Sequence, residues 1–174
     1  MMSGLVVAAV LLWTPVQGQD APAPPPAHAA PSPAEAALAA FDPLLGKTWR
    51  GASITNAGVI DEVRFERTAG GQAIRSTHSA AGGAYQGDTL IAWDPDASGL
   101  VSFYATSGGF YTTGEVKVLG PGAFEFEQDV HGLAGIEAVR AQTTLTDGVY
   151  RIRSQHQING AWVETGGFDY SPVP

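Results

Sequence analysis

Hydrophobic and polar residues alternate along several short stretches of this chain. Within residues 123–130 the even positions are Phe124, Phe126, Gln128 and Val130, and the odd positions include Glu125, Glu127 and Asp129. Residues 62–66 and 149–158 alternate in the same way. One covered face and one solvated face are typical of antiparallel strands. The acidic odd positions of 123–130 are therefore expected on an outer, solvated face.

Glycines interrupt the chain at nearly regular intervals between Leu44 and Ser171, and the segments between them are rich in β-branched and aromatic residues. Asp147-Gly148 and Asn159-Gly160 are typical of type I′ hairpin turns. Short turns place consecutive strands side by side, and no internal segment predicts a helix long enough to cover a sheet. The pattern predicts an all-β fold: an antiparallel up-and-down β-barrel of about ten strands that closes on itself.

The N-terminal part of the chain differs from the rest. Residues 5–13 read LVVAAVLLW, an apolar run too short to span a bilayer, and Val16 and Gly18 suit a signal-peptidase site. We therefore expect a signal peptide over 1–18 and an exported protein, periplasmic or extracellular. Prolines are dense in 19–33, which predicts an extended linker. Residues 34–174 are expected to form the folded domain, which starts with a short alanine-rich helix at 34–41.

Charge and composition exclude several classes of function. The 174 residues include 9 Lys+Arg, 17 Asp+Glu and no Cys, and the formal net charge is −8. This charge opposes nucleic-acid binding and attraction to anionic lipids. Without cysteine there are no disulfides, thiol nucleophiles or cysteine zinc sites. We expect no nucleic-acid partner and no membrane insertion after signal cleavage, and the oligomeric state is left open.

The first predicted strand resembles that of a known group of barrels. Residues 44–51 read LLGKTWRG, which is similar to the Gly-x-x-Trp-x-Gly start of calycin-type barrels. Together with the turn Trp93-Asp94-Pro95, it resembles uncharacterised exported bacterial proteins with lipocalin-like barrels, and more distantly nitrobindin and fatty-acid-binding proteins. The resemblance implies a lipocalin-like fold over most of the domain, but it implies little about function. It also implies that Trp49 closes one end of the barrel and packs on an arginine, for which Arg140, Arg151 and Arg153 are candidates.

The resemblance to nitrobindin also bears on haem. The iron ligand of that family is a histidine near the C-terminus, in a segment rich in small residues. The last histidine here is His156, inside a regular predicted strand, and residues 161–170 contain none. We therefore expect no haem and no other cofactor.

One short motif occurs twice. Residues 74–78 read IRSTH and residues 152–156 read IRSQH. In a strand the Ile, Ser and His of each copy share a face. We therefore expect four side chains to point into the barrel as candidate ligand-binding groups: Ser76, His78, Ser154 and His156. The alternative is that these polar side chains only fill the interior and form hydrogen bonds with water and neighbouring residues.

The remaining candidate ligand-binding residues are Tyr104, Tyr111, Gln128 and Arg140. Asp61 and Arg67 are in phase with inward residues of their segment and are expected at the cavity or its rim. Two histidines without a nearby carboxylate make an incomplete zinc site, so no metal site is predicted. A Ser-His hydrolase is disfavoured because no Gly-x-Ser-x-Gly motif is present and no Asp is spaced to orient a histidine.

These observations favour a barrel without enzymatic activity that binds a small hydrophobic or amphipathic molecule in its interior. One alternative is an interaction module whose barrel is filled by side chains. Another is an enzyme that uses the interior Ser and His groups on a bound molecule, although no catalytic residue is assigned. A cavity of several hundred Å3 would favour ligand binding, and a filled interior would favour the interaction module.

Overall fold

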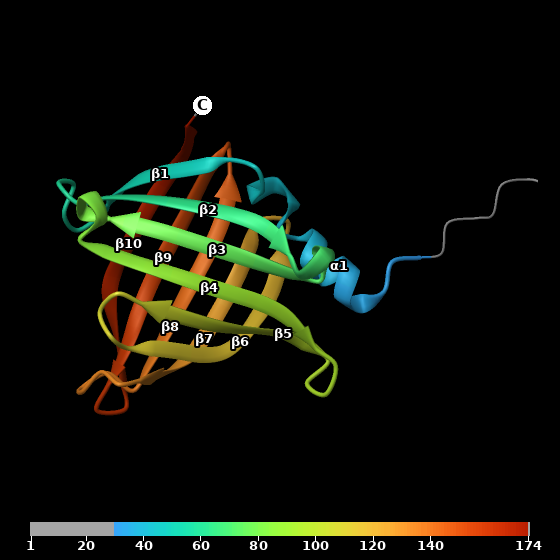
Figure 1. Ribbon diagram of the computed structural model, residues 1–174. Coiled ribbons are helices and arrows are strands. Elements are labelled where there is room, and N and C mark those ends of the chain that lie inside the picture. The colour runs from blue at the N-terminus through green and yellow to red at the C-terminus, as the bar shows by residue number, and fades with distance from the viewer. Residues whose placement is uncertain (1–29, 174) are drawn as a thin grey trace, which may run out of the picture. The chain divides into compact units, whose positions relative to one another are not determined.

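Ten antiparallel strands close into one barrel, which confirms the predicted fold class (Figure 1). The computed structural model describes residues 30–173. In chain order the strands are β1 (Thr48–Ser53), β2 (Ile60–Thr68), β3 (Ala73–Ala80), β4 (Tyr85–Asp94), β5 (Gly99–Thr106), β6 (Tyr111–Gly120), β7 (Ala123–His131), β8 (Ala138–Thr146), β9 (Val149–Ile158) and β10 (Ala161–Val173). Each pairs with its neighbours in sequence, and β1 pairs with β10. Closure pairs both edges of the sheet, so the meander needs no covering helix.

The turns follow the glycine pattern. Asp147 and Gly148 have φ values of 54° and 74°, and Asn159 and Gly160 have φ values of 50° and 76°. Positive φ at both central residues is the requirement of a type I′ turn, which agrees with the two predicted hairpins. Two short 3-10 turns with the same Ala-Gly-Gly sequence, η2 (Ala69–Gly71) and η3 (Ala81–Gly83), flank β3.

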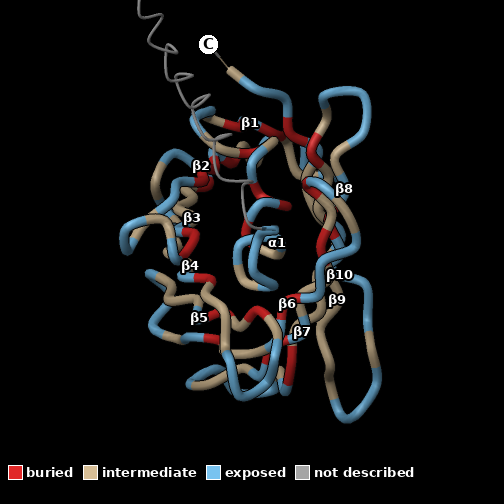
Figure 2. The backbone as a smooth tube through the Cα atoms, turned by 90° about the vertical axis from the view of Figure 1, so that its right-hand side faces the viewer, coloured by how far each residue is buried: buried red, intermediate tan, exposed pale blue. Residues whose placement is uncertain are grey.

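A short helix fills one end of the barrel. α1 (Pro33–Ala39) begins one residue earlier than expected, because Ser32 caps it: its hydroxyl accepts a hydrogen bond from the Glu35 amide, and the Glu35 carboxylate accepts one from the Ser32 amide. A single 3-10 turn, η1 (Asp42–Leu44), follows. Figure 2 looks onto this end and shows α1 within the ring of strands. The sequence predicted the helix but not its place inside the barrel.

The helical segment and the strands share one apolar core. Leu38, Phe41 and Leu44 are each 2% exposed or less. The Phe41 ring stacks on Phe124 of β7 with a centroid distance of 3.9 Å. The helical segment also contributes Ala40, and the strands contribute the remaining buried apolar residues of this core: Trp49, Val63, Phe65, Ile74, Ile91, Leu100, Val116, Tyr150 and Tyr170. We call this end of the barrel the closed end.

Trp49 belongs to this core, as the resemblance implied. It is 1% exposed, its indole Nε1 donates to the carbonyl of Leu44 at 2.9 Å, and its ring packs against Tyr150. The cation near its ring is Lys47, whose Nζ lies 5.5 Å from the ring centroid. The expectation of an arginine partner was wrong, because the three candidate arginines pair with acidic residues elsewhere: Arg140 with Glu127, and Arg151 and Arg153 with Asp169.

The other end of the barrel is bounded by the loops 54–59, 81–84, 107–110, 132–137 and 159–160, and we call it the loop end. Glu137 is the one charged residue in these loops. Ile54 and Leu133 are exposed there. The loop end therefore presents a sparsely charged, partly apolar rim on a strongly acidic protein.

Removal of the Phe41 ring should destabilise the barrel. Phe41→Ala is expected to lower the free energy of unfolding by about 3–5 kcal/mol, the usual cost of deleting a buried phenylalanine ring. Denaturant titration followed by tryptophan fluorescence measures this loss. In the control, Phe103→Ala, a ring that is 46% exposed is removed, and the loss should stay below about 1 kcal/mol. Equal losses in the two variants would contradict the role of the helical segment in the core.

Candidate functional site

A cavity of about 470 Å3 lies inside the barrel. Phe126 and Ile152 contribute to its apolar wall, and hydroxyl, amide and imidazole groups lie between such residues. Ser53, Tyr85 and Phe110 also line it, next to the loops that bound the loop end. The interior is thus filled at the closed end and hollow toward the loop end.

Six of the eight candidate ligand-binding residues line this cavity: Ser76, His78, Tyr104, Gln128, Ser154 and His156. Both copies of the repeated motif turn their Ser and His inward, as strand parity predicted. The structure therefore brings together in one interior two segments that are far apart in the sequence.

Tyr111 and Arg140 do not reach the cavity, because each is one position out of phase with an inward residue. Tyr111 is opposite Ala105 in the register, next to the inward pair of Tyr104 and Thr112. Its ring is exposed and stacks on His131 with a centroid distance of 4.6 Å. The prediction that Tyr111 and Arg140 belong to an interior site was therefore wrong.

Arg140 lies on the outer face of β8. It is opposite Glu127 in the register and donates to that carboxylate at 2.8 Å. Its guanidinium lies 4.3 Å from the centroid of the Trp162 ring.

Arg67, which was expected at the cavity or its rim, pairs with Asp42 of η1 at 2.7 Å.

A chain of side-chain hydrogen bonds follows one wall of the cavity. The hydroxyls of Tyr85 and Tyr104 are 3.1 Å apart, and the Tyr104 hydroxyl lies 2.7 Å from His78 Nε2. His78 Nδ1 lies 3.1 Å from Asp61 Oδ1, and the Tyr170 hydroxyl donates to Asp61 Oδ2 at 2.7 Å. We call these five residues the interior chain. It runs from Tyr85, at the loop end, to Tyr170, in the core of the closed end.

Gly87 allows Tyr104 to reach His78. Tyr104 is on β5 and His78 on β3, and Gly87 of the intervening β4 is directly opposite His78. A Cβ atom on Gly87 would collide with both side chains. The hydrogen bond between them therefore requires glycine at this position.

Gly51 has a similar role at the other end of the interior chain, where its missing Cβ atom lets Tyr170 reach Asp61. It lies on β1, directly opposite both Asp61 of β2 and Tyr170 of β10. A Cβ atom here would lie 2.8 Å from Cδ1 of Tyr170. Tyr170 thus crosses β1 above a glycine to reach Asp61, as Tyr104 crosses β4.

Burial controls the ionisation of this chain. Asp61 is 4% exposed, so its carboxylate depends on the donors that Tyr170 and His78 provide. Burial raises the pKa of Tyr104 and of Tyr170 well above the ordinary value; the hydrogen bond to Tyr85 adds to this effect at Tyr104, and the Asp61 charge adds to it at Tyr170. Both phenols therefore remain protonated at neutral pH and can donate hydrogen bonds.

Gln128 is held by a separate buried network. Thr112 donates to its Oε1 at 2.9 Å, and its Nε2 donates to the Ser102 hydroxyl at 2.6 Å. Both ends of the amide are thus occupied by the protein. These two bonds fix the orientation of the amide in the wall, and they leave one N–H and one lone pair of Gln128 without a protein partner in the described part of the chain.

Three further side chains of the two motif copies have polar groups without a protein partner among the described residues. Within residues 30–173, the side chains of Ser76, Ser154 and His156 make no hydrogen bond, yet no polar side-chain atom is both fully buried and unpartnered. Their polar atoms therefore face the cavity. Burial lowers the pKa of His156, so its neutral imidazole, which can both donate and accept, is favoured.

The pairing of Asp61 with His78 was not predicted from the sequence. No Asp is spaced along the sequence to orient a histidine, because the partner lies on a neighbouring strand: His78 is opposite Val63, two residues from Asp61. The one available signal was the inward phase of Asp61. Tyr85 and Tyr170 were not among the candidate site residues, and Tyr170 meets Asp61 through barrel closure.

In the described part of the chain, no three His, Asp or Glu residues are grouped closely enough to hold a metal ion. None of the helices within residues 30–173 has the length and hydrophobicity required to cross a bilayer.

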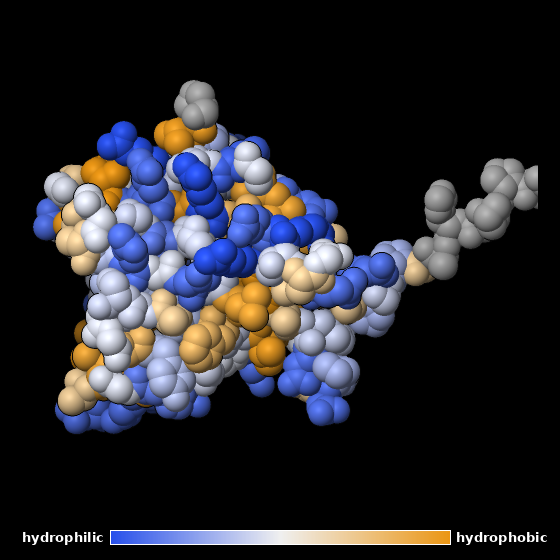
Figure 3. Space-filling view, in the orientation of Figure 1, coloured by the Kyte–Doolittle hydropathy of each residue, from blue (hydrophilic) through white to orange (hydrophobic). Residues whose placement is uncertain are grey.

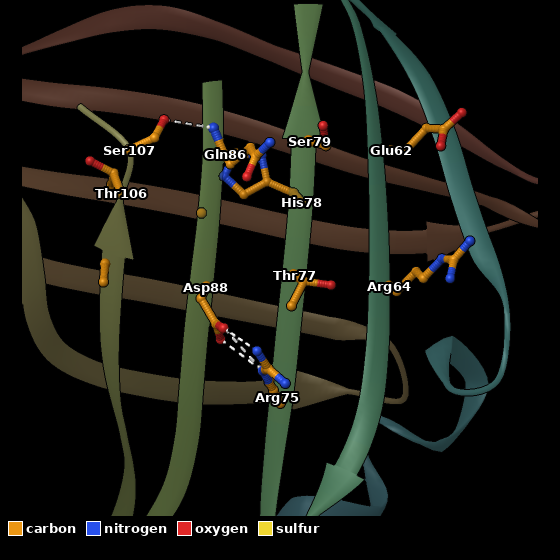
Figure 4. A pocket seen from close by; sticks show the side chains of 12 residues that line it. Glu62, Arg64, Arg75, Thr77, His78, Ser79, Gln86, Asp88, Thr106 and Ser107 are labelled. Atoms are coloured by element: carbon orange, nitrogen blue, oxygen red, sulfur yellow. Dashed lines mark hydrogen bonds and ion pairs between the residues drawn. The ribbon is translucent and has the colours of Figure 1, made fainter. Parts of the chain in front are cut away.

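A larger hollow, of about 620 Å3, lies on the outer face of β2–β5 (Figure 4). Its charged groups are partly exposed and pair with one another, as in the contact of Arg75 Nε with Asp88 Oδ2 at 3.0 Å. Figure 3 shows that side chains over β2 and β3 are largely hydrophilic on this face. Because exposed ion pairs are screened by solvent, the interior cavity is the stronger candidate for a ligand site.

Neither a scan against protein-family models nor a search of curated proteins found a match for this chain. The closed antiparallel barrel is compatible with a calycin-like fold. Function must therefore be argued from the geometry of the cavity.

Substitution of Gly87 tests the crossing of β4. Gly87→Ala is expected to lower the free energy of unfolding by about 1–3 kcal/mol, because the added methyl group displaces Tyr104 and His78 from their hydrogen bond. Gly120→Ala is the matched control, since a Cβ atom there has no neighbour within 4 Å. Denaturant titration compares the two variants. A Gly87→Ala variant as stable as Gly120→Ala would show that the close packing above Gly87 is unimportant.

The buried phenols predict a loss of stability at alkaline pH. Burial raises the pKa of Tyr104, Tyr150 and Tyr170, whereas tyrosine in an unfolded chain ionises near pH ~10. The unfolded state therefore releases protons first, and the free energy of unfolding falls as the pH rises above about 10. Tyrosinate absorbance should rise sharply when the protein unfolds. Tyr104→Phe and Tyr170→Phe should each reduce that rise by one phenol, and an unchanged rise would contradict the assignment.

Proposed function

We propose that the barrel binds an uncharged, amphipathic small molecule in its interior cavity. The observation that carries the proposal is the wall of this cavity, in which apolar side chains surround a few polar groups that face the hollow. Its volume of about 470 Å3 lies within the range of small-molecule sites, and such sites have this mixed lining.

The charges of the wall favour an uncharged ligand. The described lining contains neither lysine nor arginine, and its one carboxylate is Asp61. Both oxygens of Asp61 already accept hydrogen bonds from Tyr170 and His78. A charged head group would lose its hydration here without gaining an opposite charge, which is unfavourable. A hydroxyl or carbonyl head group avoids this cost.

The polar and apolar parts of the wall suit an amphipathic shape. Ser154 and His156 present their polar atoms from β9, and Tyr85 presents its hydroxyl from β4. Phe126 and Ile152 provide contacts for a hydrocarbon part. The sparsely charged rim of the loop end is compatible with the entry of such a molecule.

The alternatives have less support. An interaction module with a filled barrel is disfavoured by the size of the cavity. An enzyme acting on the bound molecule is favoured by one observation, the orientation of His78 by Asp61, because a carboxylate-oriented imidazole can transfer protons. Binding remains the conclusion, since it requires only the cavity and its lining.

We also propose a fold family and a cellular location for the protein. The LLGKTWRG segment supports a lipocalin-like barrel within the calycin-like architecture. Export from the cell is proposed from residues 1–18, and the signal peptide and most of the linker lie outside the described residues.

Filling the cavity tests the proposal directly. Ala141 lines the cavity, and Ala141→Trp should reduce the affinity for the uncharged probe N-phenyl-1-naphthylamine at least about tenfold, because the indole occupies the ligand volume. Probe fluorescence on titration into the full chain measures the affinity. The control is Gln142→Trp, at the exposed adjacent position, which should bind the probe like the unsubstituted protein. If both variants bind equally well, the probe does not enter the barrel and the proposal fails.

Mass spectrometry of small molecules extracted from the protein purified from its source would identify the natural ligand. An uncharged molecule with one polar end is expected. Recovery of a highly charged molecule in stoichiometric amount would contradict the proposed ligand class.

A further inference from the structure

We propose that the polar head of the ligand binds at the Tyr85 hydroxyl, and that the number of protons on the Asp61–His78 pair decides whether Tyr85 donates to it or accepts from it. This inference rests on the proposed function, since it concerns a ligand in the same cavity. It names a ligand class: with an additional proton on the pair, the site takes uncharged head groups that only accept hydrogen bonds, such as a ketone.

With one proton on the Asp61–His78 pair, the direction of each hydrogen bond in the interior chain is fixed, starting from Asp61. The Asp61 carboxylate accepts from Tyr170 and from His78 Nδ1. A neutral imidazole that donates from Nδ1 can only accept at Nε2, so Tyr104 donates to His78. The single proton of the Tyr104 hydroxyl is then used, and Tyr85 must donate to Tyr104. In this state Tyr85 presents lone pairs to the cavity.

A second proton on the Asp61–His78 pair reverses the direction of hydrogen-bond donation along the interior chain. It resides either on His78, as an imidazolium beside a carboxylate, or on Asp61, which then donates to His78 Nδ1. In both cases His78 Nε2 carries a hydrogen and donates to Tyr104. Tyr104 then donates to Tyr85, and the Tyr85 proton points into the cavity. The two placements of the proton give the same result at the ligand.

The surroundings of His78 leave this pair as the place for the proton. The groups that face it from the neighbouring strands are the other members of the interior chain: Asp61 on β2, Tyr85 on β4, Tyr104 on β5 and Tyr170 on β10. Tyr150 and His156, both on β9, are the remaining titratable groups in the described lining. On its outer side His78 also borders the hollow of Figure 4, whose charged residues are Glu62, Arg64, Arg75 and Asp88. Two acidic and two basic groups balance there, and the described interior lining adds no lysine or arginine.

The direction of hydrogen-bond donation along the interior chain distinguishes a ketone head group from a hydroxyl head group. A ketone oxygen only accepts, so it forms a full hydrogen bond only with the reversed chain. A hydroxyl both accepts and donates, so it matches either direction. Ketone binding is therefore linked to proton uptake, and by reciprocity a lower pH favours ketone binding.

The test compares 2-nonanone with 2-nonanol, which differ only in the head group. Displacement of N-phenyl-1-naphthylamine from the full chain gives both association constants between about pH 5 and about pH 8, where histidines usually titrate. The ratio of the ketone constant to the alcohol constant should fall about three- to tenfold across this range. That change corresponds to the usual net contribution of one hydrogen bond.

Two variants and one control complete the experiment. Tyr85→Phe removes only the terminal hydroxyl, and His78→Gln removes the imidazole of the Asp61–His78 pair; each should give a ratio that no longer depends on pH. In the control, Gln86→Ala, the adjacent outward side chain is removed, and the ratio should behave as in the unsubstituted protein. If both probes bind with a constant ratio in the unsubstituted protein, this inference fails while the proposed function stands. If neither probe binds, both proposals fail.

Discussion

The buried carboxylate of Asp61 is the constraint on which the interior of this barrel depends. An unpaired charge at a site that is 4% exposed costs several kcal/mol, so both oxygens require donors. Tyr170 and His78 supply them from opposite sides. Tyr170 reaches Asp61 across Gly51 of β1. One charge thus determines residue types on several strands and makes this wall polar, ordered and internally bonded.

The number of strands explains why the barrel is filled at one end and hollow at the other. Eight strands give an interior that side chains can just fill, so ten strands leave additional space. The segment with Leu38, Phe41 and Leu44 occupies that space at the closed end and forms a continuous core there. Toward the loop end, no described helix takes this place, and the cavity remains. Stability and ligand capacity are therefore separated along the barrel axis.

Much of this architecture could be predicted from local patterns, and the parts that could not depend on tertiary register. Alternation and glycine turns predicted ten strands, closure and the inward Ser and His of both motif copies. Tyr111 was misplaced because its face depends on the register across the turn at 107–110, which spacing does not reveal. The contact of Tyr170 with Asp61 joins residues 109 positions apart and exists only because β10 lies beside β1. The helix carries no local sign that it enters a barrel.

The two ends of the described chain leave the barrel on the same side. α1 lies at the closed end, and Val173 of β10 is opposite Thr48, the first residue of β1, which follows η1 directly. The rim of the loop end is therefore built from turns alone. A support or fusion partner joined at either terminus would hold the barrel by its filled base, with the mouth turned toward the solution. Attachment and ligand exchange would then occupy opposite poles of the domain and would not compete for the same surface.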